Sequence, residues 1–129
     1  MKVPAFLLRR LYVKGSLRNV DDGFEFDLRN TLGSGYAERA LPLTVGDTEI
    51  PLASTRFVVQ GAVTRFADVS PEHPMTLGTN QTVTVAVTGQ RLPNGMHRIG
   101  IGFVVVGMGE MRFDVSDAIA NVEDGDDAA

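Results

Sequence analysis

The side chains best suited to chemistry are few in this sequence, which holds two histidines and no cysteine. His73 lies between Glu72 and Pro74 in a turn-like segment, and His97 opens an apolar, strand-like run. A transition-metal site normally needs several imidazole, thiolate or carboxylate ligands that converge on one ion. We therefore expect no metal site, unless the fold brings His73 and His97 together.

Glycine-containing motifs that could hold a nucleophile or a phosphate lack the context which that chemistry requires. Gly33-Ser34-Gly35 is not set between a strand and a helix, and neither Gly100-x-Gly102 nor Gly107-x-Gly109 opens a helix. We expect no catalytic residue and no bound cofactor. The glycines at 100 and 102 instead leave one side of a strand bare, which favours a bend in the sheet over a close approach of another surface.

Paired carboxylates are the usual equipment for general acid–base catalysis, and Glu25 and Asp27 form such a pair. They alternate with apolar residues and lie near Lys14, Arg18 and Arg29 in the sequence. Cross-strand ion pairs on a solvated sheet face account for this pattern. A catalytic role would need a pocket that shifts a pKa, and the sequence contains no sign of one.

Two segments carry residue types that are enriched at protein interfaces. Tyr36 and Arg39 stand together in a segment that we expect to be a loop, and aromatic and arginine side chains dominate binding hot spots. Met108 lies in a glycine-rich turn before Met111, and methionine adapts to partner surfaces. We expect Tyr36, Arg39 and Met108 to form a partner interface. The alternative is structural, with Tyr36 covering an end of the fold and Met111 in its core.

Alternation of apolar and polar residues with period two is the dominant pattern along the chain. Asp21-Asp22-Gly23 separates two such runs and is typical of a hairpin turn. The best helix candidate, Val115–Val122, is short and has no capping residue. The sequence therefore predicts an all-β, jelly-roll-like antiparallel β-sandwich in a single domain, residues 1–121. We expect at least seven strands, drawn from the runs 11–18, 24–28, 41–45, 50–52, 57–59, 64–69, 82–88, 99–105 and 111–115.

The charge distribution separates the body of the chain from its end. Residues 1–120 hold twelve basic and twelve acidic side chains, and the last nine residues add four acidic ones. A neutral body is a poor match for a phosphate backbone, so we expect no nucleic-acid partner. Residues 122–129 are acidic and poor in apolar side chains, which predicts a disordered tail.

No export or membrane segment is apparent. The apolar run Val3–Leu8 is interrupted by Pro4 and followed by Arg9 and Arg10. A spanning helix needs about 20 apolar residues, and a signal peptide needs a longer apolar stretch than this one. The absence of cysteine fits a reducing compartment, so we expect a soluble, cytoplasmic protein with no membrane partner.

Three runs of the sequence carry a family resemblance. They are Lys14–Asn19 with Asp22–Asn30, Leu41–Pro51 and Leu92–Ile99. Together they resemble the small subunit of bacterial C-glycoside deglycosidases and its stand-alone relatives. The resemblance implies a β-sandwich that associates with a larger TIM-barrel-type catalytic subunit, which holds a divalent metal and the catalytic residues. The complex of that family cleaves the carbon–carbon bond between a 3-oxo sugar and an aromatic aglycone.

The leading hypothesis from the sequence is therefore a non-catalytic accessory subunit of a metal-dependent sugar-processing complex. The alternative is a stand-alone β-sandwich that binds a carbohydrate or another small molecule and self-associates. Some chains of similar sequence are described as hydroxymethylglutaryl-CoA reductases. We expect that description not to apply, because the chain is short for that chemistry and has no nucleotide-binding fingerprint.

Overall fold

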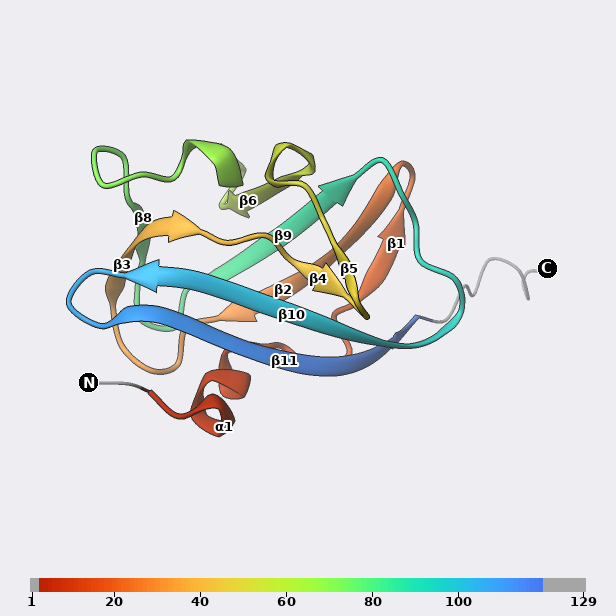
Figure 1. The fold of residues 1–129 in the computed structure, drawn as a ribbon, viewed down its shortest axis with the longest axis horizontal. Helices are drawn as coiled ribbons and strands as arrows, with labels where there is room; N and C mark the ends of the chain where they lie inside the picture. Colours follow the sequence, from red (N-terminus) through yellow and green to blue (C-terminus); the bar gives the residue numbers. More distant parts are fainter. Residues whose placement is uncertain (1–2, 120–129) are drawn as a thin grey trace.

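The fold is two antiparallel sheets packed face to face, as Figure 1 shows for a computed structural model that describes residues 3–119. Eleven strands lie within these residues, and every strand pairing is antiparallel. The predicted all-β antiparallel sandwich is confirmed. The predicted domain end at residue 121 and the predicted disordered tail, 122–129, lie outside the described residues.

The first sheet has the strand order β1-β2-β9-β6-β7. Its first two strands form the predicted hairpin, with Asp21 and Asp22 in the turn. Phe24, Phe26 and Leu28 are buried in the core. The apolar face of this strand therefore points inward, as its alternating pattern predicts. The strands are β1 (Arg18–Val20), β2 (Gly23–Arg29), β6 (Thr55–Val59), β7 (Ala62–Arg65) and β9 (Thr82–Thr88).

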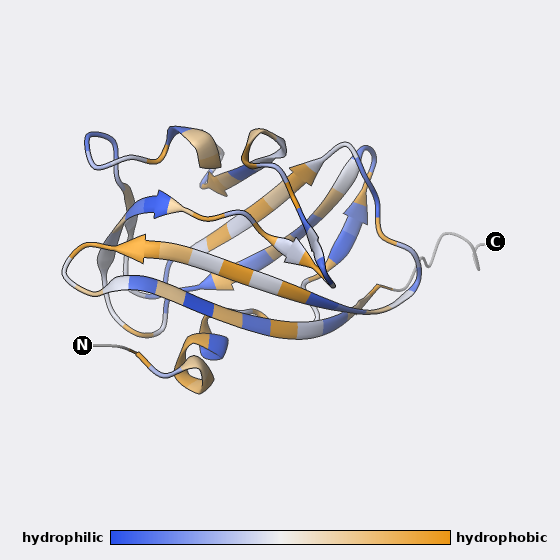
Figure 2. Cartoon of the chain, in the orientation of Figure 1, coloured by the Kyte–Doolittle hydropathy of each residue, from blue (hydrophilic) through white to orange (hydrophobic). Residues whose placement is uncertain are grey.

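The second sheet has the order β5-β4-β10-β3-β8, and β11 pairs with β10 along its whole length. Figure 2 shows the alternation of apolar and polar residues that buries one face of β10 and β11. A register shift between Val104 and Val105 marks a bulge where β10 meets β3. The strands are β3 (Gly35–Ala40), β4 (Thr44–Val45), β5 (Thr48–Glu49), β8 (Met75–Leu77), β10 (Gly95–Val105) and β11 (Gly109–Ile119).

The core lies between the sheets and is built from large apolar side chains of both. Phe24 and Phe26 are fully buried from the first sheet, and Ile99 is fully buried from the second. Phe57 stacks on Phe66 with 4.2 Å between ring centroids, which places the short turn after β7 over the core. That turn is η3 (Phe66–Asp68), and a similar one, η2 (Leu52–Ser54), precedes β6.

The N-terminal segment differs from the prediction. A strand was expected from Leu11, but the chain forms α1 (Ala5–Leu8) and η1 (Arg9–Leu11), makes an isolated bridge from Tyr12 to Leu28 of β2, and becomes a strand of the first sheet at β1. We call residues 5–17 the N-terminal arm. Its Leu8, Leu11 and Leu17 are buried in the core, while α1 packs beside β11. The arm therefore closes the open edge of the sandwich, and Gly15, at φ +85°, supplies a conformation that a continuous strand excludes.

The second sheet agrees with one expectation from the sequence and corrects another. The best helix candidate, Val115–Val122, is strand as far as the described residues reach, because β11 continues to Ile119. A bend in the sheet was expected at Gly100 and Gly102, but the structure instead places a neighbouring segment close to both glycines. A side chain at Gly100 would collide with Thr44 Oγ1, and one at Gly102 would lie 3.1 Å from Leu41 Cδ1. The glycines therefore make room for the β3–β4 connection on the outer face of β10.

Candidate functional site

An apolar groove of about 380 Å³ opens at the end of the sandwich where β10 turns into β11. We call it the end groove. The N-terminal arm contributes Leu7, Leu8 and Leu11, and the β2–β3 loop and the β10–β11 turn form the other walls. None of the described residues that line it is charged. The groove therefore offers apolar contact area without the cost of burying a charge.

Four large apolar side chains of the end groove are exposed to solvent. Leu32 is 42% exposed, Tyr36 54%, Val106 55% and Met108 36%. The Val106 amide donates to the Tyr36 carbonyl at 3.0 Å, which ties the β10–β11 turn to the start of β3. The structure thus brings two of the predicted interface residues, Tyr36 and Met108, into one groove.

Arg39, the third predicted interface residue, lies elsewhere on the same strand. It is exposed and stands opposite Val104 of β10, but it does not line the end groove. The segment that holds Tyr36 and Arg39 was expected to be a loop, and it is strand β3. A strand advances about 3.3 Å per residue, so three positions separate the two side chains by about 10 Å along the sheet.

Asn30 positions the wall of the end groove, and sequence reasoning did not single it out. This side chain is 8% exposed. Its Nδ2 donates to the Gly33 carbonyl at 2.6 Å, and its Oδ1 accepts from the Leu32 amide at 3.3 Å. An asparagine at the end of a strand before Gly-Ser-Gly was the available signal, because asparagine readily bonds to nearby backbone.

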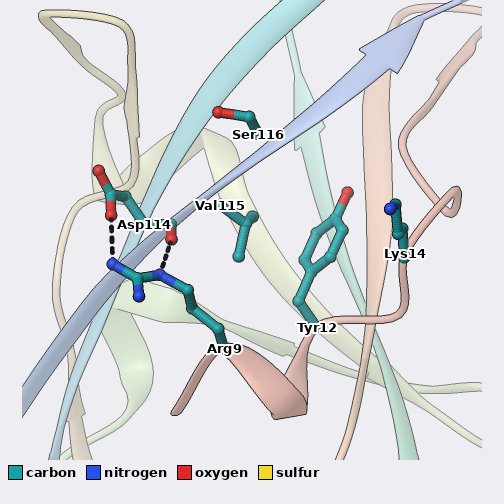
Figure 3. Close-up of a pocket in the computed structure, with 6 residues that line it drawn as sticks. All are labelled: Arg9, Tyr12, Lys14, Asp114, Val115 and Ser116. Carbon is teal, nitrogen blue, oxygen red and sulfur yellow. Dashed lines mark hydrogen bonds and ion pairs between the residues drawn. The ribbon is translucent and has the colours of Figure 1, made fainter. Parts of the chain in front are cut away.

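A second hollow, of about 450 Å³, lies between the N-terminal arm and β11 (Figure 3). We call it the edge hollow. It is lined by polar and apolar groups in similar measure. Arg9 Nε donates to the Asp114 carbonyl at 3.0 Å, and its Nη2 lies 3.5 Å from Asp114 Oδ1. The lining residues are Arg9, Tyr12, Lys14, Asp114, Val115 and Ser116.

Asp117 fastens the arm to β11 beside the edge hollow. Its Oδ2 accepts from the Tyr12 hydroxyl at 2.7 Å and from the amides of Gly15 at 2.9 Å and Leu17 at 3.4 Å. Its Oδ1 accepts from the Ala118 amide at 2.9 Å. Asp117 is 8% exposed, and no sequence motif pointed to it. This carboxylate therefore joins the edges of the two sheets.

The contacts of Asp117 act on two pKa values. Burial tends to raise the pKa of Asp117, but the Tyr12 hydroxyl and the three backbone amides outweigh it and hold that pKa below its ordinary value. Burial, followed by the bond to Asp117, raises the pKa of Tyr12 well above its usual range. The pair therefore stays a neutral phenol that donates to a charged carboxylate at neutral pH.

The paired carboxylates of β2 form the ion pairs that the sequence predicted. Arg18 Nη2 lies 2.7 Å from Glu25 Oε1 and 3.3 Å from Asp27 Oδ1. Thr84 donates to Asp27 Oδ1 at 2.8 Å. These contacts hold β1, β2 and β9 together on the solvated face of the first sheet.

Each of the two histidines has a contact of its own with the backbone. His73 forms an isolated bridge with Ser70, and His97 Nε2 lies 2.8 Å from the Pro93 carbonyl oxygen. Residues 3–119 contain no group of three or more His, Asp or Glu side chains arranged to hold a metal ion. In the same residues, every helix is too short to cross a membrane.

The chain was compared with known families and proteins. The family whose model matches is described as hydroxymethylglutaryl-CoA reductase, N-terminal domain, and the match spans residues 7–120. No curated protein matches the chain.

The family match overturns two expectations from the sequence. The resemblance to the small subunit of C-glycoside deglycosidases is wrong, because the match is to a different family. The runs that carried it are turns and alternating strands, such as the β1–β2 and β4–β5 hairpins, which many antiparallel sandwiches share. The expectation that the reductase description does not apply is also wrong at the level of the family.

Proposed function

The chain belongs to the family of hydroxymethylglutaryl-CoA reductase N-terminal domains, and from that premise we propose that it is a non-catalytic interaction domain that binds a protein partner through the end groove. The observation that carries the proposal is the groove itself, an uncharged surface that presents four exposed apolar side chains. The expected role in interaction remains, but a sugar-processing partner is no longer expected, because the resemblance that suggested that partner is wrong.

The composition of the end groove supports a protein partner. The buried centres of protein interfaces are depleted in charged residues and enriched in aromatic residues and methionine. Tyr36 and Met108 supply both residue types, and the leucines of the arm complete the wall. A sugar would need several polar groups that fix its hydroxyls, and the groove is mostly aliphatic. The groove therefore suits a partner's apolar side chains better than a carbohydrate.

Asn30 adds a second line of support. A binding surface works best when its shape is fixed before the partner arrives. The two bonds from the Asn30 side chain hold the loop that carries Leu32, and the Val106 amide fixes the turn against Tyr36. The groove is thus held open in a defined shape by contacts that involve no partner.

Family membership favours a second candidate function. The matched family is named for a reductase, so the second candidate function is a contribution to the reduction of a hydroxymethylglutaryl thioester. The purified chain is incubated with hydroxymethylglutaryl-CoA and a reduced nicotinamide cofactor, and cofactor absorbance is followed. Turnover by the chain alone would replace the interaction role with a catalytic one.

The experiment for the interaction role uses two valines of nearly equal exposure. Val106 is 55% exposed in the end groove, and Val63 is 57% exposed on β7. Val106→Asp introduces a charge into the groove, and Val63→Asp is the matched control on another part of the surface. The native complex is purified from the cells that make the protein, and its mass is measured by light scattering for the wild type and both variants.

We expect the wild type and Val63→Asp to be recovered in a complex and Val106→Asp to be recovered alone. Circular dichroism and melting temperature check that both variants are folded. Recovery of all three proteins as free monomers would contradict the interaction role. A complex made of two copies of this chain would identify the partner as self.

A further inference from the structure

The edge hollow combines cationic groups with an apolar wall, and its lining residues differ from the arm leucines that line the end groove. Arg9 and Lys14 supply the two positive charges, and Ser116 supplies a hydroxyl. The ring of Tyr12 and the side chain of Val115 stand between them, as Figure 3 shows. This arrangement matches a small molecule with one charged end and an apolar body.

The charges around the edge hollow leave one cation without a counterion. Arg9 is paired with Asp114, and Arg98 Nε also lies 3.9 Å from that carboxylate. Among residues 3–119, no carboxylate lies within ion-pair distance of Lys14. Asp114 and the neighbouring Asp117 balance part of the positive charge, so the unpaired Lys14 ammonium is the group available to bind an anion.

The walls of the edge hollow are held in place by bonds that do not involve a ligand. Asp117 fixes the hydroxyl of Tyr12 and the amide of Gly15, the residue that follows Lys14. Two bonds to Asp114 fix the Arg9 guanidinium. A site whose walls are already fixed loses less conformational entropy when a ligand binds.

We propose that the edge hollow is a binding site for a small carboxylate with a short apolar body, with Lys14 as the charge partner. The apolar body packs between Tyr12 and Val115, and the carboxylate accepts hydrogen bonds from the Lys14 ammonium and the Ser116 hydroxyl. The unpaired ammonium of Lys14 favours an anionic ligand over a cationic one. A fully polar ligand would leave the Tyr12 ring and Val115 without contacts. The proposal does not depend on the end groove.

The test is a titration of the ¹⁵N-labelled full chain with butyrate, followed by amide chemical shifts. Butyramide, which has the same shape and no charge, is the matched ligand. We expect butyrate to shift the amides of residues 14–16 and 114–116 in a saturable manner and butyramide to bind about two- to fivefold more weakly, the range that loss of an exposed charge contact implies. Inorganic phosphate, an anion without an apolar body, should also bind more weakly than butyrate.

Two variants assign the effect to the site. Lys14→Gln should weaken butyrate binding by about two- to fivefold, again the range for one exposed charge contact. Arg10→Gln makes the same change in net charge at an exposed residue outside the hollow, and should change the affinity less than about twofold. Equal binding of butyrate and butyramide, or equal losses in the two variants, would overturn the proposal. Tighter binding of phosphate than butyrate would overturn the apolar part of it.

Discussion

The end groove and the edge hollow are each held in shape by one buried polar side chain, and the two side chains differ in charge. Asn30 and Asp117 are equally buried, at 8% exposure. Asn30 holds a loop with a neutral amide that both donates and accepts. Asp117 holds the N-terminal arm with a carboxylate that only accepts, from one hydroxyl and three amides. The same task, fixing backbone near a surface, is performed with and without a charge.

The difference follows from what each side chain must satisfy. The β2–β3 loop turns back on itself, so it presents a carbonyl from Gly33 and an amide from Leu32, and an amide side chain matches one of each. The arm presents donors alone, and only a carboxylate can accept from several donors without placing an N–H against them. The two regions should therefore respond differently to acid.

The largest expected effect lies in the core, next to a residue that lines the edge hollow. Phe26 is fully buried, and its ring lies 5.6 Å from that of Tyr12, measured between centroids. Phe26→Ala should lower the free energy of unfolding by about 3–5 kcal/mol, because a large cavity opens in a close-packed core. Urea unfolding of the two proteins measures the loss. A loss below about 1 kcal/mol would show that this strand is not the centre of the core.

Removing the charge of Asp117 should produce the next largest loss of stability. Asp117→Asn removes the charge and sets an amide N–H against one or more of the donors from Tyr12, Gly15, Leu17 and Ala118. We expect the variant to lose about 1.5–3 kcal/mol at pH 7, the range for hydrogen bonds to a charged group. Urea unfolding at pH 7 measures it. A loss like that of an ordinary surface substitution would mean that the arm is held by its leucines alone.

The pH dependence of that loss sharpens the comparison. Because the pKa of Asp117 is lowered in the folded protein, its stabilising contribution is complete above the pKa of the unfolded chain, about 3.9 for an aspartate. The contribution disappears as the pH falls through the lower, folded-state pKa. The difference between wild type and Asp117→Asn should therefore shrink between pH 7 and about pH 3. A difference that grows on acidification would contradict the direction of the pKa shift.

Removing the neutral side chain of Asn30 should cause a smaller loss of stability that does not depend on pH. Asn30→Ala leaves the Gly33 carbonyl and the Leu32 amide without their side-chain partners, which should cost about 1–2 kcal/mol. Hydrogen exchange at residues 31–34 should accelerate while exchange in β9 stays slow. The stability loss should be the same at pH 7 and pH 4. A strong pH dependence would show that Asn30 is coupled to an ionisable group.

The strands were predictable from the sequence because their pattern is local. Alternation at Phe24–Leu28 and at Thr82–Thr88 identifies β2 and β9, since each strand buries every second side chain. The turn at Asp21-Asp22 follows from turn chemistry alone. The alternation also predicts which face of the Phe24–Leu28 strand is buried.

The arm and the two buried polar side chains could not be predicted in this way. Leu8, Leu11 and Leu17 enter the core from a helical turn and a loop, and their irregular spacing carries no single period. Asp117 acts on residues about a hundred positions away, so nothing near it in the sequence marks its role. Tyr36 and Met108 were identified by residue type, but only the meeting of β3 with the β10–β11 turn brings them together.

The smallest expected effect on stability concerns the predicted interface itself. Tyr36 is 54% exposed, and Arg39 is exposed on the same strand. Arg39→Ala should change the free energy of unfolding by less than about 0.5 kcal/mol, because its side chain is exposed. Tyr36→Ala should lower it by about 1 kcal/mol, because nearly half of the tyrosine is buried. Their effects on association should differ: Tyr36→Ala should weaken partner binding by about tenfold or more, the scale of an interface aromatic. Arg39→Ala should weaken it by less, since Arg39 does not line the end groove. Equal losses of binding would place the contact surface along β3, whereas unfolding of Tyr36→Ala would make that tyrosine a structural cover for the end of the sandwich.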